Sequence, residues 1–318
     1  MKILITGGAG FIGSNFIRYM LNKYRDYRIV NFDKLTYAGN LKNLSDVQGN
    51  KNYSFIRGDI CDKNAVKKAI KGCSIVINFA AETHVDRAIL DAGSFVQTDV
   101  YGTYILLQSA KMHRIKKYIQ ISTDEVYGSI KKNSFSEDNS LNPRNPYSAS
   151  KAGADTLALS FFTTYNTPVV ITRSSNNFGP YQHPEKLIPL FITNILEDKK
   201  VPLYGDGNNV RDWLYVIDNC EAIDFVVNNG KDGEVYNISG NNEKRNIEVT
   251  KLILKKLGKN ESYIEYVTDR LGHDRRYSLD CKKIEKLGWR PRHVFDSALD
   301  STISWYKKNI SWWKELKK

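Results

Sequence analysis

The stretch Gly7-Gly8-Ala9-Gly10-Phe11-Ile12-Gly13 decides the fold. It follows a short apolar run, Lys2 to Ile5, which is typical of a buried strand. It also opens a segment in which Ile12, Phe16 and Met20 recur at helical spacing. Glycines between a strand and a helix permit a tight turn, a close approach of the backbone to a pyrophosphate, and close helix–strand packing. The helix then offers its amide groups and positive end to the phosphates, so the stretch predicts a dinucleotide-binding turn.

A carboxylate in register with this turn indicates which dinucleotide binds. Asp33 ends the second predicted strand, Arg28 to Phe32, and comes twenty residues after Gly13. A carboxylate there accepts hydrogen bonds from the adenosine ribose and repels a 2′-phosphate, which favours NAD over NADP. Asp59-Ile60 and Ala80-Ala81 end later strands and are predicted to border the adenine and the middle of the cofactor.

Further apolar runs extend the pattern into an α/β fold with a Rossmann-type doubly wound parallel sheet. The remaining predicted strands are Ser54 to Arg57, Ile75 to Phe79, Tyr118 to Ile121 and Val169 to Thr172, and one helix, with Val66 and Ile70 on its apolar face, follows a cap at Asp62. After about Asn176 turn signals cluster and strands become irregular, which predicts a smaller C-terminal substrate-binding α/β domain. We expect a NAD-binding domain over 1–176 with a return to the main sheet at about 211–235, and a second domain over 177–210 and 236–318, closed by one aromatic helix over 296–317.

Composition excludes several classes of protein. The chain has 318 residues, of which 41% are hydrophobic, so it can bury a sizeable core, and its net charge is +12. The lysines are scattered without a long basic run, which favours a surface that attracts small anions over a nucleic-acid partner.

Four distant cysteines indicate reduced thiols, and five histidines without ligand spacing predict no metal site. Because no apolar stretch could span a bilayer or serve as a signal peptide, we expect a cytoplasmic protein without a membrane partner.

A phenol and an ammonium are placed for acid–base chemistry. Tyr147 and Lys151 are four residues apart, so they share one face of a helix. The ammonium, like an oxidised nicotinamide, favours the phenolate and would make the tyrosine a usable base near neutrality. The pair follows by one βα unit Ser122-Thr123, at the strand edge where open α/β sheets bind ligands.

Together these features resemble the extended short-chain dehydrogenase/reductase family and, within it, the family of dTDP-glucose 4,6-dehydratases, over nearly the whole chain. The segments that carry the resemblance are 31–40 (NFDKLTYAGN), 80–87 (AAETHVDR), 122–128 (STDEVYG), 145–152 (NPYSASKA), 175–180 (SNNFGP), 184–189 (PEKLIP), 211–214 (RDWL) and 269–276 (DRLGHDRR). Two positions depart from the pattern. Leu271 stands where the family has proline, and Thr83 where it usually has serine.

The resemblance implies an NAD-dependent hydro-lyase that converts dTDP-glucose to dTDP-4-keto-6-deoxyglucose in the biosynthesis of nucleotide-activated, rhamnose-type deoxysugars. Oxidation at carbon 4 is followed by loss of water across carbons 5 and 6 and by return of the hydride to carbon 6. Tyr147, helped by Lys151, is expected to take the hydroxyl proton on carbon 4, and Thr123 to hydrogen-bond that oxygen. Glu125 would remove the proton on carbon 5, and Asp124 would protonate the hydroxyl that leaves carbon 6.

The resemblance also implies the binding residues. Those expected around NAD are Gly7, Gly10, Phe11, Ile12, Gly13, Asp33, Lys34, Thr36, Asp59, Ile60, Ala80, Ala81, Thr98, Tyr147, Lys151 and Asn176. Those expected around the nucleotide sugar, in the second domain and at the domain junction, are His84, Thr123, Asn177, Lys186, Leu187, Pro202, Tyr204, Arg211, Asn246, Asp269 and His273. Arg211 and Asn246 would hold the diphosphate, Tyr204 would stack on the base, and the loop from Asp269 to His273 would close the pocket.

Three alternatives stay open. A nucleotide-sugar 4-epimerase needs no elimination and predicts small or apolar residues where Asp124 and Glu125 stand. An RNA-binding protein on the same fold predicts a damaged site, whereas Thr123, Tyr147 and Lys151 are all present. A dehydratase of another nucleotide sugar, such as UDP-GlcNAc or GDP-mannose, differs only in the second domain. The helices expected at Ser94 to Met112 and Tyr147 to Thr164 predict, by resemblance, a homodimer paired through a four-helix interface.

Overall fold

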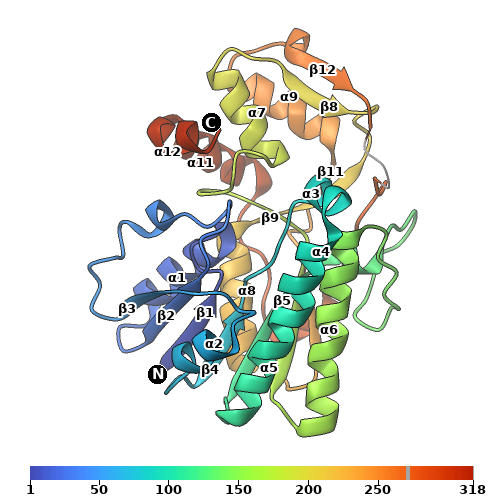
Figure 1. Ribbon diagram of the computed structural model, residues 1–318. Coiled ribbons are helices and arrows are strands. Elements are labelled where there is room, and N and C mark those ends of the chain that lie inside the picture. Colours follow the sequence, from blue (N-terminus) through green and yellow to red (C-terminus); the bar gives the residue numbers. More distant parts are fainter. Residues whose placement is uncertain (270–272, 318) are drawn as a thin grey trace.

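A seven-stranded parallel sheet forms the centre of the computed structural model, which describes residues 1–269 and 273–317 (Figure 1). Its strands are β1 (Lys2–Thr6), β2 (Arg28–Asp33), β3 (Tyr53–Arg57), β4 (Ile75–Asn78), β5 (Lys117–Thr123), β6 (Val169–Ser174) and β10 (Val235–Ile238). They are hydrogen-bonded in the order β10-β6-β5-β4-β1-β2-β3. The order reverses direction between β1 and β4, where a doubly wound sheet opens a crevice at its carboxyl edge. The predicted fold class is confirmed, and each of the six predicted strands has a counterpart in the sheet.

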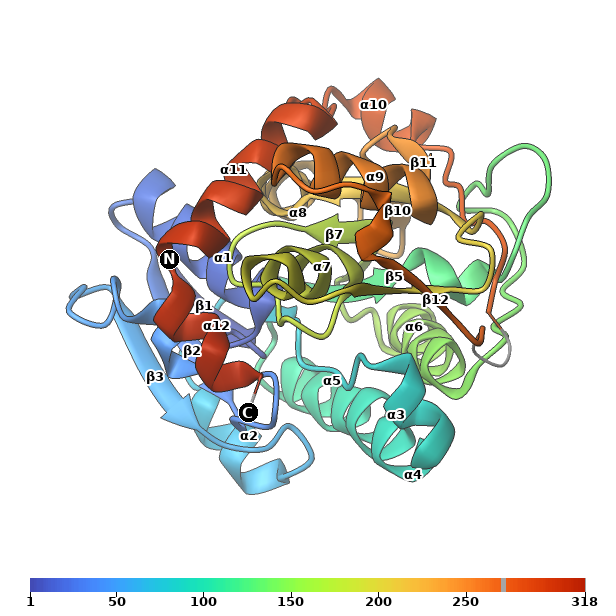
Figure 2. The same cartoon turned by 90° about the horizontal axis from the view of Figure 1, so that it is seen from above.

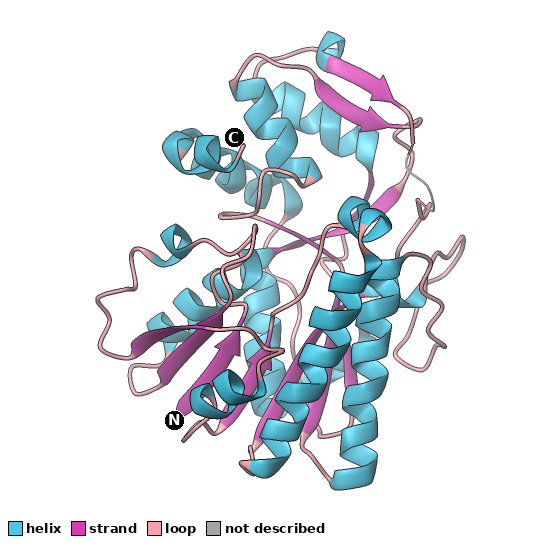
Figure 3. Cartoon of the chain, in the orientation of Figure 1, coloured by secondary structure: helices cyan, strands magenta, loops and turns pink. Residues whose placement is uncertain are grey.

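Helices cover both faces of the sheet, because successive side chains of a strand point to opposite sides (Figure 3). Ile3 and Ile5 of β1 pack in one core with α1 (Phe11–Lys23) and α8 (Val216–Asn229). Leu4, between them, packs in the other core with α2 (Lys63–Ala69), α5 (Thr103–Met112) and α6 (Pro146–Tyr165). Among the described residues, no helix combines the length and the apolar character needed to cross a bilayer.

The helical run before β5 contains a local irregularity. After α3 (Val85–Leu90), it passes through α4 (Ala92–Phe95), a π-helical segment (Val96–Gly102) and then α5, so the helix expected from Ser94 to Met112 is present but widened in its first half. π-Helical turns are rare and frequently lie at functional sites. This one presents Thr98 to the pocket described below and buries Asp99.

The second half of the chain builds a smaller unit around its own apolar core at the carboxyl edge of the sheet (Figure 2). Its elements are β7 (Asn176–Phe178), α7 (Leu187–Leu196), β8 (Val201–Tyr204), β9 (Val210–Tyr215), β11 (Glu243–Arg245), α9 (Asn246–Lys256), β12 (Ile264–Val267), α11 (Phe295–Lys308) and α12 (Ile310–Leu316). α10 (Lys282–Leu287) comes from the same half of the chain but packs through Ile284 in the core of the main sheet. The chain does return to the main sheet, but the strand that does so is β10, which lies later than expected. β9 joins the small sheet β11-β9-β7 instead, and α8 covers the main sheet. The division into two domains stays a prediction.

The prediction of a single closing helix over 296–317 was wrong, because α11 and α12 are separated at Asn309. Residues seven apart on a straight helix lie about 10 Å apart along its axis. The rings of Trp305 and Trp312 are nevertheless 4.9 Å apart between centroids, and the indole of Trp313 donates to the Tyr306 carbonyl at 2.9 Å. The bend therefore lets the aromatic residues pack on one another.

A buried ion pair anchors α6 to the sheet just behind the pocket. The carboxylate of Asp155 on α6 accepts hydrogen bonds from Arg173 Nε on β6 and from Ser122 Oγ on β5, each at 2.9 Å. Arg173 also donates to the Tyr127 hydroxyl at 2.7 Å. Removing one partner of a buried pair leaves the other charge desolvated without compensation.

Replacing Asp155 should therefore destabilise the fold strongly. We expect Asp155→Ala to lower the free energy of unfolding by about 3–5 kcal/mol, measured by urea denaturation. The control is Asp232→Ala, which removes the more exposed ion pair to Lys117 and should cost less than about 1 kcal/mol. Equal losses for the two variants would contradict the anchoring role.

Candidate active site

One pocket of about 470 Å³ lies at the carboxyl ends of the central strands, between the main sheet and the second unit. Its wall contains every residue expected for catalysis and for the cofactor, and every residue expected for the substrate except Asp269. Residues that are distant in the chain meet here because parallel strands all end at the same edge. The structure thus brings the predicted residues together, while their individual roles stay predictions.

The glycine turn has the close packing that its sequence predicts. Gly7 has φ +65°, and a Cβ there would lie 2.6 Å from the backbone nitrogen of Ala80. A Cβ on Gly13 would lie 2.4 Å from the Gly7 carbonyl oxygen. The first turn of α1 has Gly10 as its N-cap, without a side chain to occupy the free amides. This open helix end is a ready site for a phosphate.

Asp33 joins the glycine turn to the end of β2. Its carboxylate accepts hydrogen bonds from the backbone N–H groups of Ala9 and Leu35, each at 2.8 Å, and the residue is 7% exposed. Burial raises the pKa of Asp33, although the two amide donors oppose the shift. A carboxylate oxygen has a second lone pair, so Asp33 can still accept from ribose hydroxyls. The turn, the uncapped helix and this carboxylate together fit a dinucleotide.

Tyr147 and Lys151 are buried on the first turns of α6. The helix begins with an Asn145 capping box and Pro146, which fix where Tyr147 enters the pocket. Lys151 Nζ donates to the Ile121 carbonyl at 2.7 Å.

The expectation that Lys151 and an oxidised nicotinamide together favour the phenolate of Tyr147 stays a prediction. Burial first, and then the charges of Glu125 and Asp99, raise the pKa of Tyr147 well above its ordinary value. The phenol therefore keeps its proton until positive charge is brought beside it.

Asp124 and Glu125 follow β5 in a short 3-10 turn (Asp124–Tyr127) but have different surroundings. Asp124 is 3% exposed and accepts a hydrogen bond from Thr123 Oγ1 at 3.2 Å. Burial, and then the neighbouring Glu125 charge, raise the pKa of Asp124 well above its ordinary value. Glu125 has two polar contacts, with Asn145 Nδ2 at 3.4 Å and the Tyr277 hydroxyl at 3.5 Å. Adjacent carboxylates in unequal environments can divide the roles of acid and base.

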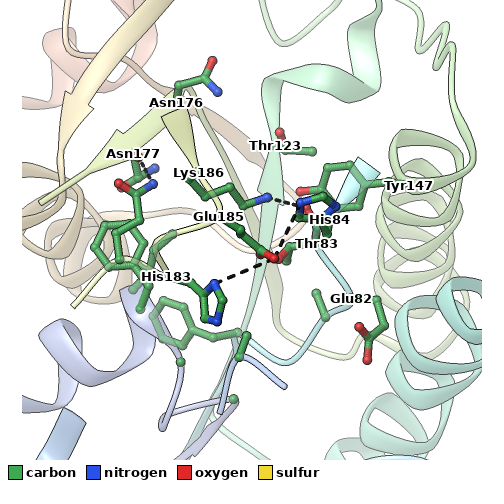
Figure 4. Close-up of a pocket in the computed structure, with 18 of the residues that line it drawn as sticks. Glu82, Thr83, His84, Thr123, Tyr147, Asn176, Asn177, His183, Glu185 and Lys186 are labelled. Carbon is green, nitrogen blue, oxygen red and sulfur yellow. Dashed lines mark hydrogen bonds and ion pairs between the residues drawn. The ribbon is translucent and has the colours of Figure 1, made fainter. Parts of the chain in front are cut away.

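Several pocket residues were missed by the sequence reasoning. Figure 4 shows Glu185 between His84 and His183, with distances of 3.6 and 3.8 Å from its carboxylate to their ring nitrogens. The Tyr37 hydroxyl donates to the same carboxylate at 3.3 Å. Glu185 and Tyr37 lie inside segments that carry the family resemblance, but their positions in the sequence do not indicate that they are in contact.

Asp99 is a second omission. Its carboxylate accepts from Ser150 Oγ at 2.6 Å and from the Glu82 backbone N–H at 3.0 Å. Burial, opposed by the charge of Lys151, raises the pKa of Asp99 to about 6. Asp99 lies within the helix expected from Ser94 to Met112, but nothing in that expectation indicated a buried carboxylate.

The substrate half of the pocket is formed by helix starts and by the end of β8. Lys186 precedes α7 and donates to the Thr83 carbonyl at 2.9 Å, whereas Asn246 begins α9. Arg211 donates to the carbonyls of Val210 and Asp274, and its guanidinium lies 4.3 Å from the centre of the Tyr277 ring. Tyr204 is 39% exposed, which leaves its ring available for stacking.

The predicted closing loop is described only at its two ends. Asp269 Oδ1 lies 2.6 Å from His273 Nδ1, while residues 270–272, including Leu271, lie outside the described residues. Within the described ranges, no group of three or more His, Cys, Asp or Glu side chains is arranged to hold a metal ion.

Comparison with known proteins places the chain among nucleotide-sugar dehydratases. The profile of the GDP-mannose 4,6 dehydratase family matches residues 4–302. A dTDP-glucose 4,6-dehydratase of Streptomyces niveus is 48% identical over 322 residues, which span 100% of this chain and 96% of the relative.

Two solved structures are similar over almost their full length. DesIV, a dTDP-glucose 4,6-dehydratase of Streptomyces venezuelae crystallised with NAD, has a TM-score of 0.98 at 47% identity and is covered to 100%, with 99% of this chain. A dTDP-glucose 4,6-dehydratase of Bacillus anthracis in complex with NAD has a TM-score of 0.94 at 52% identity, with 99% of each chain covered.

The coupling between the adjacent carboxylates can be tested directly. Because the Glu125 charge disfavours ionisation of Asp124, Glu125→Gln should lower the pKa of Asp124. The measurement is 13C NMR of aspartate-labelled protein, with the Asp124 signal assigned from Asp124→Asn. Glu185→Gln, in the same pocket, is the control and should leave that pKa nearly unchanged. A pKa of Asp124 that stays constant or rises in Glu125→Gln would show that the two side chains are not coupled.

Proposed function

We propose that this chain, which belongs to the GDP-mannose 4,6-dehydratase family, is an NAD-dependent dTDP-glucose 4,6-dehydratase. It converts dTDP-glucose to dTDP-4-keto-6-deoxyglucose, a step in the biosynthesis of nucleotide-activated deoxysugars. The observation that carries the proposal is the pair Asp124 and Glu125 beside Tyr147, in a pocket whose other end fits a dinucleotide. An epimerase has no use for two carboxylates at this strand end.

The residues around the dinucleotide hold it and bring it to the reacting sugar. The glycine turn and the start of α1 receive the pyrophosphate, and Asp33 receives the adenosine ribose. NAD, when bound, accepts a hydride from carbon 4 and later returns it to carbon 6, and its oxidised ring adds positive charge beside Tyr147. That charge offsets the burial and the negative neighbours that keep the phenol protonated.

The protein's own acid–base groups carry the proton transfers. Tyr147 takes the proton of the carbon 4 hydroxyl, while Thr123 donates a hydrogen bond to the same oxygen. The ketone at carbon 4 acidifies the proton on carbon 5, which Glu125 removes and returns to carbon 5 when the hydride is added to carbon 6. Asp124, whose pKa is raised by burial, supplies a proton to the hydroxyl that leaves carbon 6 as water.

The remaining pocket residues bind the nucleotide sugar. Arg211 and Asn246, which line the pocket, hold the diphosphate, and Lys186 borders the nucleoside. Tyr204 stacks on the base, and His84 borders the sugar. The choice of thymine nucleotide over others rests on these residues of the second unit and on the family relatives.

The function is tested by mass-resolved assays with dTDP-glucose and UDP-glucose in parallel. We expect loss of one water from dTDP-glucose without added NAD, because the cofactor is regenerated in each cycle. Asp124→Asn should reduce the rate of water loss by about 10²–10⁴-fold, whereas Asp300→Asn, on a surface ion pair with Lys256, should not change it. Formation of an isomeric sugar without water loss would contradict the proposal and favour an epimerase.

We further propose a homodimer paired through α5 and α6. The two helices lie side by side on one face of the molecule (Figure 1). They and the π-helical segment before α5 carry five exposed large residues, which we call the apolar band: Val96 (55%), Tyr101 (44%), Tyr104 (38%), Met112 (53%) and Tyr165 (46%). Exposed apolar surface marks association sites when it gathers on one face, and two helices from each subunit give a four-helix interface.

Light scattering should give about twice the 36.4 kDa mass of the chain. Tyr104→Arg places a charge in the band and should shift the protein toward monomers. Val294→Arg, at a residue that is 69% exposed and precedes α11, is the control and should leave the mass unchanged. A monomeric mass for the unmodified protein would remove the proposal.

The cysteines support a cytoplasmic location. All four are free, and Cys73, Cys220 and Cys281 are buried. Proteins in oxidising compartments more often pair such residues.

A further inference from the structure

The C-terminal helix α12 reaches the glycine turn through one intervening residue, Asn43. Trp312 Nε1 donates to Asn43 Oδ1 at 2.9 Å. The amide of the same Asn43 side chain donates to the Ala9 carbonyl at 2.8 Å. Asn43 is 2% exposed and Trp312 8%, so both hydrogen bonds are shielded from water. The last helix of the chain is thus linked to the first turn by two buried hydrogen bonds in series.

The backbone of Ala9 links the glycine turn to three other residues. Its N–H donates to Asp33, and its carbonyl accepts from both the Asn40 backbone N–H at 3.0 Å and the Asn43 side chain. A shift of Asn43 would therefore move the backbone of the turn that is expected to hold the pyrophosphate.

The contact between α12 and the region after β2 extends beyond these two bonds. Arg18 on α1 forms an ion pair with Asp46 at 2.6 Å and donates to the Asn43 carbonyl at 2.7 Å. Its guanidinium lies 4.5 Å from the ring centre of Tyr181, which packs on Trp312. Figure 2 shows α12 crossing above the β1–β2 side of the sheet. Asn43, Trp312 and Leu316 all line the pocket together with the glycine turn.

We propose that Trp312 and Asn43 form a clasp that slows release of the dinucleotide, so that the cofactor remains bound through many catalytic cycles. The inference rests on the proposed function, because NAD is the ligand that the clasp retains. Opening the wall formed by α12 would break the Trp312–Asn43 hydrogen bond. The net free energy of a typical intramolecular hydrogen bond corresponds to up to about a tenfold change in a rate constant.

The experiment measures dissociation of NAD from the full-length protein. Holoenzyme is mixed with an excess of labelled NAD, and the loss of unlabelled NAD is followed by mass spectrometry of the protein-bound fraction. Trp312→Phe keeps the aromatic packing but removes the N–H donor, and should release NAD about tenfold faster. Asn43→Ala removes both bonds and should release it at least as fast. Because the bonds act in series, the double variant should release NAD no faster than Asn43→Ala alone.

The matched control is Lys42→Gln, next to Asn43. Lys42 forms an exposed ion pair with Glu315 on the same helix α12, and loss of an exposed pair should change the release rate by no more than about twofold. Thermal unfolding of the NAD-free variants separates release from loss of fold. If Trp312→Phe lowers the thermal stability but releases NAD at the rate of the unmodified protein, the clasp proposal is overturned. It is also overturned if both single variants release NAD at the rate of the unmodified protein. If the unmodified protein binds no NAD at all, the proposed function is overturned together with it.

Discussion

The hydrogen bond from the Ala9 amide to the Asp33 carboxylate is the interaction on which the arrangement of this protein depends. It fixes the glycine turn against the end of β2, and the close approach of Gly7 to Ala80 fixes the same turn against the segment after β4. Three strand ends are therefore held in one geometry around the start of α1. The second unit then packs over this edge of the sheet. The shape of the pocket therefore depends on the close contacts of the glycine turn with Asp33 and Ala80, which require glycine and a short carboxylate side chain.

In the protein without a ligand, the charges around Tyr147 do not favour its ionised form. Asp99, Asp124 and Glu125 lie within range of Tyr147, and they disfavour the ionised phenol together with burial. Lys151 directs its ammonium at a backbone carbonyl. In the proposed mechanism, the oxidised cofactor would supply the positive charge that favours ionisation of Tyr147. Burial, and then the charge of Glu125, raise the pKa of Asp124, which suits the acid role proposed for it.

Local patterns predicted one half of this site well and the other half poorly. The glycine turn, Asp33 and Tyr147/Lys151 were found because each signal lies within a few residues of a strand or helix boundary, and the family resemblance added Asp124 and Glu125. The contact of Tyr37 with Glu185 joins residues 148 positions apart, and the periodic patterns of helices and strands do not indicate such a pair. Substrate residues such as Lys186 and Asn246 came from family resemblance alone. The break at Asn309 was missed because the helical spacing of aromatic residues continues across it, and only packing among the indole rings requires the bend.

The late position of β10 has a consequence for how the chain folds as it leaves the ribosome. β6, its neighbour in the sheet, ends at Ser174, and β10 begins about 60 residues later at Val235. At a synthesis rate of roughly 5–20 residues per second, the edge of β6 waits about 3–12 s for its partner. In that interval an apolar strand with unpaired backbone groups is open to pairing with other chains. The nascent protein therefore passes through a period in which chaperone binding at β6 would protect it from aggregation. The period ends when β10 has been synthesised, before β11, α9, β12, α11 and α12 of the second unit.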